Sequence, residues 1–338
     1  MRVLVTGATT SVGEAVVHAL HEQRFVEHVL GVGLEPEAPH AVDGPRYTYH
    51  AIDLTRSRAL HDLLWGIGRD LGIDTVIHAA LHRSPRATGQ HAHALNVDAT
   101  RQLVLACERH PTVRRFVHRS AGEVYALRWN EPTLLDEDAP LEFDPGSPQW
   151  VRDRVAADLT VCARTNMSQL SIAVLRCAEV FAAGTGSQLW DYVRSRVCMR
   201  PLGFDPMINV SSLADHATAI VLAAASHATG VFNIPGADTL PLSAMIARAG
   251  CRAVPVPGPL LAPLYQLRRW ALGLEFRYDL NLRRFHFGGV LNGTRARREL
   301  GYVPRTSLWP EPPAADRRPP VGIPVNAPAQ PESRTRGG

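Results

Sequence analysis

Residues 3–13 read VLVTGATTSVG, a short apolar run followed by a turn with two glycines and the start of a helical pattern. Such a turn, directly after a first strand, brings backbone amides and a helix N-terminus towards a pyrophosphate, and glycine is needed where the backbone comes closest. The middle glycine of the usual GxxGxxG spacing is Thr10 here, and its Cβ is expected to crowd the phosphates. The turn predicts cofactor contacts at Gly7, Thr9, Thr10, Ser11, Val12 and Gly13. A turn that only joins a strand to a helix is the alternative interpretation.

β-branched apolar runs continue to alternate with amphipathic helical patterns beyond this turn. This order is typical of βαβ units, so the predicted fold class is α/β, a doubly wound parallel sheet of Rossmann type with a small C-terminal substrate lobe. The predicted strands are Val3–Thr6, His28–Val32, Tyr47–Ile52, Thr75–Ala79, Arg115–Ser120, Ile172–Arg176 and Val231–Ile234. The predicted helices cover residues 12–23, 57–69, 90–109, 150–166 and 213–226.

The regular pattern gives way to Gly/Pro punctuation after residue 180, which predicts a division of the chain. Residues 1–180 are expected to form mainly the nucleotide-binding domain, to which residues 205–235 return. Residues 181–204 and 236–309 are expected to form the substrate lobe. Residues 310–338 are rich in proline and have little to bury, so a disordered tail is predicted there.

The composition is that of an ordinary globular protein. Of the 338 residues, 45% are hydrophobic and 20% are charged, which excludes a chain that is disordered throughout. No apolar run reaches the length of a membrane span, and the N-terminus lacks a signal-peptide pattern, so a cytoplasmic protein is expected. All 36 basic residues are arginine, which excludes every lysine-dependent reaction.

Neither the cysteines nor the histidines are spaced for a metal. The five cysteines lack CxxC spacing, which indicates reduced thiols. His78, His82, His91 and His93 cluster locally but have no suitably spaced carboxylate, so no metal site is expected. No helix-turn-helix, zinc-finger or ribonucleoprotein signature accompanies the basic C-terminal part, so no specific nucleic-acid partner is expected.

The end of the second predicted strand bears on the choice of cofactor. A dinucleotide site usually has an acidic residue there for the adenosine ribose, but Gly33 stands at that position and Glu35 follows two residues later. Either Glu35 reaches back or the contact is lost, and weak NAD binding is expected. No arginine lies near this strand end before Arg46, so a 2′-phosphate has no obvious partner and NAD is favoured over NADP.

Several ordered segments add a family resemblance to the glycine turn. They are Asp53-Leu54, VIHAA at 76–80, NVDATRQLVLAC at 96–107 and VRRFVHRSAGEVYA at 113–126. Over residues 1–304 the chain resembles the extended short-chain dehydrogenase/reductase family, the NAD-dependent sugar epimerases and dehydratases. The resemblance implies NAD as cofactor and a small-molecule, nucleotide-linked substrate. It also implies that Asp53 and Leu54 lie at the adenine, that Ala79 and Ala80 line the cofactor, and that Asn96 supports the active site.

The same resemblance locates the catalytic positions, and most of them are substituted. The family uses the tyrosine and lysine of YxxxK together with a serine. Trp150 and Arg154 stand at the YxxxK spacing, and Ala121 stands at the serine position. Trp150 has no proton to exchange near neutral pH, whereas Arg154 can still bridge ribose hydroxyls of the cofactor. Glu123, which matches the glutamate of the dehydratase motif, is the one candidate base left.

Two functional hypotheses follow from these residues. The first is an NAD-dependent epimerase/dehydratase-family enzyme with a degenerate YxxxK site that acts on a nucleotide sugar or a similar substrate. The second is a non-catalytic NAD- or ligand-binding accessory protein, for which a membrane surface is one of the locations left open. Both hypotheses allow the protein to be a homodimer.

Residues 260–285 allow more than one interpretation. Leu260, Leu264, Leu267, Ala271 and Leu274 form an apolar stripe at helical spacing. Trp270 and two arginines lie beside the stripe. Such a helix either packs its stripe over the substrate cleft or lies on an anionic membrane surface, and its arginines also suit a substrate diphosphate.

Overall fold

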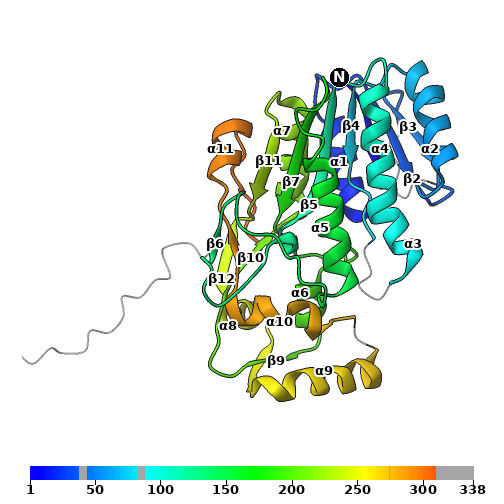
Figure 1. Cartoon of the computed structure of the whole chain (residues 1–338). Coiled ribbons are helices and arrows are strands. Elements are labelled where there is room, and N and C mark those ends of the chain that lie inside the picture. Colours follow the sequence, from blue (N-terminus) through cyan, green and yellow to red (C-terminus); the bar gives the residue numbers. More distant parts are fainter. Residues whose placement is uncertain (38–43, 83–87, 274, 310–338) are drawn as a thin grey trace, which may run out of the picture. The chain divides into compact units, whose positions relative to one another are not determined.

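The first strand, β1 (Arg2–Thr6), lies inside a seven-stranded parallel sheet in a computed structural model of the chain (Figure 1). The structure describes residues 1–37, 44–82, 88–273 and 275–309. The strand order is β11-β7-β5-β4-β1-β2-β3, and every neighbouring pair is parallel. The other six strands are β2 (His28–Gly33), β3 (Tyr47–Ala51), β4 (Thr75–His78), β5 (Arg115–Ala121), β7 (Ser171–Cys177) and β11 (Gly230–Ile234). The predicted doubly wound α/β fold is confirmed.

Helices cover both faces of this sheet because successive strand residues are apolar and point to opposite sides. Val3 and Val5 pack with α1 (Ser11–His21), α7 (Leu213–Ala225) and α11 (Thr294–Leu300). Leu4 packs on the other side with α2 (Ser57–Leu63), α4 (Ala99–Arg109) and α5 (Gln149–Cys162). The carboxyl ends of the strands therefore meet at one edge of the sheet, where loops carry the candidate site.

Two of the predicted helices are interrupted. A π-helical turn, Leu64–Gly68, follows α2, and a second one, Ala94–Asp98, joins α3 (Gln90–His93) to α4. Periodicity alone does not reveal such turns, because the apolar spacing continues through them. The second turn contains Asn96, one of the predicted site residues.

The C-terminal part is more regular than the sequence indicated. It contributes to three small sheets in the order β12-β10-β8, β13-β9 and β14-β6, in which β6 and β8 come from the preceding part of the chain. Their strands are β6 (Leu134–Leu135), β8 (Glu179–Val180), β9 (Val197–Pro201), β10 (Met207–Ser211), β12 (Asp238–Pro241), β13 (Arg252–Val256) and β14 (Val290–Leu291). The helices are α6 (Gln188–Val193), α8 (Leu242–Arg248), α9 (Gly258–Leu272) and α10 (Tyr278–Phe287). The division into domain and lobe stays a prediction, and the predicted disordered tail, 310–338, lies outside the described residues.

One expectation about α9 is wrong. The predicted stripe does not pack over the cleft, because Leu264 and Leu267 face solvent; Leu274 lies outside the described residues. Leu261 and Tyr265, on the other side of the helix, are buried instead. The Tyr265 ring packs against Phe276 and other aromatic rings of this region, which selects that side as the inner one. Within the described chain, no helix has the length and apolar content needed to cross a membrane.

Candidate functional site

The turn after β1 depends on its two glycines. Gly7 has a φ of +70°, and a Cβ at this position would lie 2.8 Å from the Cα of Ala80. A Cβ on Gly13 would lie 2.0 Å from the carbonyl oxygen of Gly7. Since contacts this short cannot form, both glycines are required by the close approach of β1, α1 and the chain after β4.

Thr10, at the middle glycine position, is the N-cap of α1. Its hydroxyl accepts a hydrogen bond from the Gly13 amide at 3.0 Å and donates to the Gly7 carbonyl at 2.8 Å. Thr10 therefore uses one of the amides that a helix N-terminus offers to an anion. The amides of Ser11 and Val12 donate to no other residue in the described chain, so they stay available to a phosphate.

An acidic side chain at the end of β2 would require Thr9 and Tyr49 to move. A Cβ on Gly33 would lie 2.6 Å from Thr9 Oγ1 and 2.9 Å from the Tyr49 hydroxyl. Glu35 does reach back, but its carboxylate accepts from the Thr9 hydroxyl, and its carbonyl accepts from the Tyr49 hydroxyl at 2.5 Å. A ribose hydroxyl at this edge would therefore meet the Thr9–Glu35 pair instead of an acid at the strand end.

Asp53 and Leu54 take structural places after β3. The Asp53 carboxylate accepts from the Thr55 amide at 3.0 Å and from the Thr55 hydroxyl at 2.6 Å, and these hydrogen bonds lower its pKa. Leu54 is buried in the core with α2. Both contacts belong to the turn that begins α2, so the implied adenine contact stays a prediction.

The chain after β4 is tied to the glycine turn and to the π-helical turn of Asn96. Ala79 is buried, and the Ala80 amide donates to the Thr6 hydroxyl at 3.2 Å. The side-chain oxygen of Asn96 accepts from the His82 amide at 2.8 Å. Asn96 therefore holds the loop that follows β4, which makes it a positioning residue in this structure.

Trp150 and Arg154, at the YxxxK positions, are both buried on α5. The guanidinium carbon of Arg154 lies 3.6 Å from the centre of the Trp150 ring, and each residue is 8% exposed. Nε and Nη1 of Arg154 have no hydrogen-bond partner among the described residues, and burial lowers the pKa of the guanidinium to about 10. Because buried charges in proteins are normally paired, these two nitrogens indicate a bound ligand.

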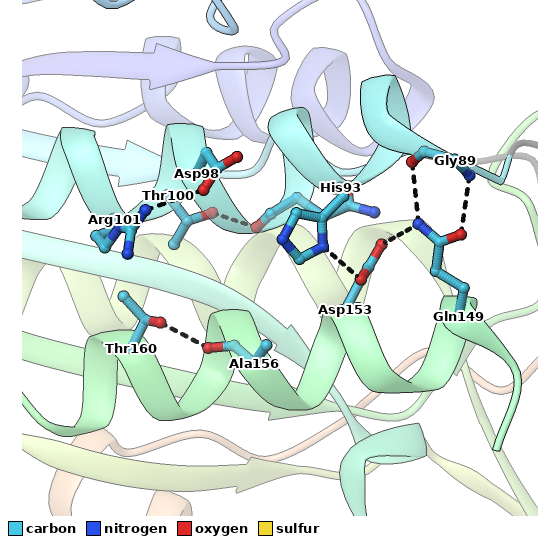
Figure 2. A network of polar contacts seen from close by, with 10 residues as sticks. Gly89, His93, Asp98, Thr100, Arg101, Gln149, Asp153, Ala156 and Thr160 are labelled. Atoms are coloured by element: carbon cyan, nitrogen blue, oxygen red, sulfur yellow. Dashed lines mark hydrogen bonds and ion pairs between the residues drawn. The ribbon is translucent and has the colours of Figure 1, made fainter. Parts of the chain in front are cut away.

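Polar contacts with the neighbouring helix α3 hold the start of α5 in place (Figure 2). The Gln149 side chain exchanges two hydrogen bonds with the Gly89 backbone, at 2.8 and 3.0 Å. Asp153 accepts from Gln149 at 3.1 Å and lies 2.8 Å from Nδ1 of His93. Gln149 and Asp153 directly precede Trp150 and Arg154 in the chain, so these contacts position the two substituted catalytic residues.

Ala121 ends β5 and offers no hydroxyl, and Ser120 does not replace the missing serine. The Ser120 hydroxyl donates to the carboxylate of Asp158 at 2.5 Å. Asp158 in turn forms a buried ion pair with Arg176 at 2.7 Å, and Arg176 donates to the Tyr125 hydroxyl at 3.1 Å. Ser120 and Tyr125 are therefore occupied in a structural network behind the site.

Glu123 lies where two cavities meet. The first, here called the inner cavity, is lined by Arg119, Glu123, Trp150, Arg154, Glu179 and His216 among others. Glu123 also lines the larger, outer cavity, and its half-buried carboxylate forms no hydrogen bond with another described residue. It is therefore free to contact a substrate at the junction.

The outer cavity has a volume of about 230 Å³ and largely apolar walls. These walls include Tyr125, Leu127, Leu135, Trp150, Leu280 and Leu282. The two arginines that line it already form ion pairs. Arg283 pairs with Glu142 and with Asp144, the latter at 2.7 Å, and Arg284 pairs with Glu179. A diphosphate in this cavity would have to compete with these carboxylates.

Arg119 and His216, which line the inner cavity, were not predicted. Arg119 Nε donates to His216 Nε2 at 3.0 Å, so His216 carries its proton on Nδ1. Burial and then the charge of Arg119 hold the pKa of His216 well below its usual value. The sequence signal for Arg119 was its charge near the carboxyl end of RFVHRSA, a strand pattern that is largely buried.

Comparisons with known proteins place the chain among its relatives. The model of the NAD dependent epimerase/dehydratase family matches residues 3–234. An uncharacterized protein of Mycobacterium tuberculosis is 31% identical over 310 residues, which cover 90% of this chain and 80% of that protein. A 3-diazoavenalumate denitrifying reductase of a Streptomyces species is 28% identical over 316 residues, which cover 91% of this chain and 98% of the reductase.

A solved structure shares the fold. It is a dTDP-glucose 4,6-dehydratase from Streptomyces venezuelae with NAD bound, 21% identical, with a TM-score of 0.69 over 91% of this chain and 93% of that chain. The family model spans all seven strands of the parallel sheet, and its description supports NAD as the cofactor that the sequence predicted. The chain therefore belongs to the NAD-dependent epimerase/dehydratase family.

Proposed function

We propose that the protein is an NAD-dependent oxidoreductase of this family that acts on a small molecule without the tyrosine–lysine pair. The observation that carries this proposal is the buried guanidinium of Arg154, which stands at the lysine position with two unpartnered nitrogens. The residues present fit NAD. The amides of Ser11 and Val12 suit its pyrophosphate, and Arg154 suits its ribose hydroxyls.

The proton chemistry falls to Glu123. When bound, NAD would supply or accept a hydride. A hydride that moves to or from a carbinol carbon is accompanied by a proton at the oxygen, and a nearby group must hold that proton. The Trp150 indole cannot do so near neutral pH. Glu123 has an available carboxylate at the junction of the two cavities, which supports it as the acid–base group.

The substrate is proposed to be a small molecule held in the outer cavity. A nucleotide-linked substrate is the class that the family resemblance predicts, and the dehydratase with the same fold is named for dTDP-glucose. The Streptomyces relative is named a reductase, which supports reduction as the type of reaction. Since Arg283 and Arg284 are paired with acids, a substrate without a diphosphate would leave these ion pairs intact.

Replacing Arg154 with methionine is expected to weaken NAD binding while the protein stays as stable as the wild type or becomes more stable. The lost hydrogen bonds involve a charged donor and are typically worth about 1.5–3 kcal/mol, or about ten- to hundredfold in Kd. The stability is maintained because the variant removes an unpaired buried charge. Calorimetric titration with NAD and thermal unfolding measure the two quantities.

Arg152→Met is the matched control on the same helix. Arg152 is exposed and donates to the Pro145 carbonyl at 2.7 Å, so its replacement should leave NAD affinity unchanged. Equal affinity of Arg154→Met and the wild type would contradict the assigned role. A wild-type protein that shows no saturable NAD binding would contradict the proposed function itself.

A non-catalytic ligand-binding protein is the second candidate, and one observation favours it. Ala121 and Trp150 remove the hydroxyl and the phenol that the family's chemistry requires. This candidate predicts the same loss of NAD affinity in Arg154→Met but no turnover by the wild-type protein. Wild-type turnover that Glu123→Gln abolishes would therefore favour the enzyme over the binding protein.

A further inference from the structure

Helix α9 presents an apolar face to solvent at the margin of the molecule, beside α10 (Figure 1). The exposed fractions are 53% for Leu260, 38% for Leu264, 60% for Leu267, 85% for Trp270 and 62% for Leu272. Single exposed apolar residues need no explanation, but Leu260, Leu264, Leu267 and Trp270 lie on one side of the helix and form a patch typical of an interaction surface.

The exposed face is not a consequence of loose packing on the inner side. Leu261 is completely buried, and Tyr265 packs against the rings of Phe276 and Tyr278. The Tyr265 hydroxyl also donates to the Met199 carbonyl at 2.8 Å. The inner side of α9 is therefore well anchored, and the helix holds the opposite face outward.

Most charges around this face are positive, and the exposed Asp279 beside Arg269 is paired with Arg277. Gly258–Leu272 contains two arginines and no acidic residue. Arg268 donates to the carbonyls of Ser195 and Val197 at 2.9 and 2.6 Å, which brings the loop before β9 against the helix. The exposed cations of this loop and its neighbours are Arg194, Arg196, Arg252 and Arg269. Apolar side chains, a tryptophan and a rim of arginines suit an anionic lipid surface.

We propose that α9 docks the protein onto an anionic membrane surface. Leu264, Leu267 and Trp270 would lie at the boundary of headgroups and acyl chains, and Arg194 and Arg196 of the loop held by Arg268 would contact the phosphates. A symmetric contact with a second copy is less favourable, because a two-fold interface would bring these arginines close to their own counterparts. This surface is separate from the proposed NAD site.

The test is co-sedimentation of the full chain with vesicles of phosphatidylcholine and phosphatidylglycerol in equal amounts, and with vesicles of phosphatidylcholine alone. We expect binding to the mixed vesicles that weakens with salt, and weaker binding to phosphatidylcholine. Leu267→Ser/Trp270→Ser should reduce the partition coefficient about tenfold or more. Phe25→Ser/Met167→Ser is the control, because both residues are exposed outside this region and their replacement should change nothing.

Three results would overturn the proposal. They are a wild-type protein that does not bind the mixed vesicles, a Leu267→Ser/Trp270→Ser variant that binds them equally well, and a wild-type dimer that this variant converts to a monomer. Should that variant fail to fold by circular dichroism, Arg194→Glu/Arg196→Glu replaces it, since both positions are exposed. This second variant should lose the binding to mixed vesicles, and unchanged binding would overturn the proposal as well.

Discussion

Replacing Arg176 with methionine is expected to lower the free energy of unfolding by about 3–5 kcal/mol. Arg176 donates to Asp158 at 2.7 and 3.1 Å, and Asp158 is 0% exposed. Without the guanidinium, this buried carboxylate would keep only the Ser120 hydroxyl and the weak Cys162 thiol as donors. Breaking a buried ion pair on one side is costly because the remaining charge stays buried. Urea unfolding followed by circular dichroism measures the loss.

Two controls separate this effect from a general loss of charge. Asp158→Leu combined with Arg176→Met removes both charges and should cost less than Arg176→Met alone. Arg58 pairs with Asp62 at 3.9 Å on the surface, so Arg58→Met should produce no measurable change. An Arg176→Met variant as stable as the wild type would show that the network behind the site does not stabilise the fold.

Acidification from pH 6.5 to pH 5 is expected to lower the free energy of unfolding by about 3 kcal/mol through two buried histidines. His78 and His118 lie on neighbouring strands with ring centroids 5.6 Å apart. Burial lowers the pKa of His78 to about 3 and that of His118 to about 4, from an ordinary value of 6.5. Below pH 6.5 the unfolded chain therefore binds protons that the folded protein does not. Well below pH 6.5, each histidine lowers the free energy of unfolding by about 1.36 kcal/mol per pH unit. The stability that each neutral histidine preserves is fully present only above pH 6.5.

His118→Phe isolates one of these two groups. The slope of unfolding free energy against pH should fall by about one proton relative to the wild type. His227→Phe is the control, since His227 is exposed and its replacement should leave the slope unchanged. Equal slopes for His118→Phe and the wild type, measured by urea unfolding at several pH values, would contradict the assignment.

The fold could be predicted because its periodicities are strong. Every predicted strand belongs to the one parallel sheet, since a sheet covered on both faces requires apolar residues at successive positions such as Val3, Leu4 and Val5. Helix α9 shows the limit of this reasoning. It carries apolar residues on two sides, and the aromatic partners that select Tyr265 over Leu264 include Tyr192 from another segment of the chain.

The site could be predicted only in outline. The glycine turn and the substituted YxxxK positions are local patterns, and the structure places Trp150, Arg154 and Glu123 around one cavity. The hydrogen-bond partners depend on side chains that are far apart in sequence. Neither the pairing of Ser120 with Asp158 nor that of Arg119 with His216 follows from spacing, because these partners are 38 and 97 residues apart.

This family member is expected to lack tyrosine–lysine chemistry, and the decisive assay is the interconversion of UDP-glucose and UDP-galactose with NAD. General acid–base catalysis is typically worth about 10²–10⁴ in rate, so we expect at most residual turnover from the wild-type protein. Any residual turnover should disappear in Glu123→Gln and rise when Ala121→Ser, Trp150→Tyr and Arg154→Lys are combined. Robust wild-type turnover that Glu123→Gln leaves unchanged would contradict both the missing phenol chemistry and the role of Glu123.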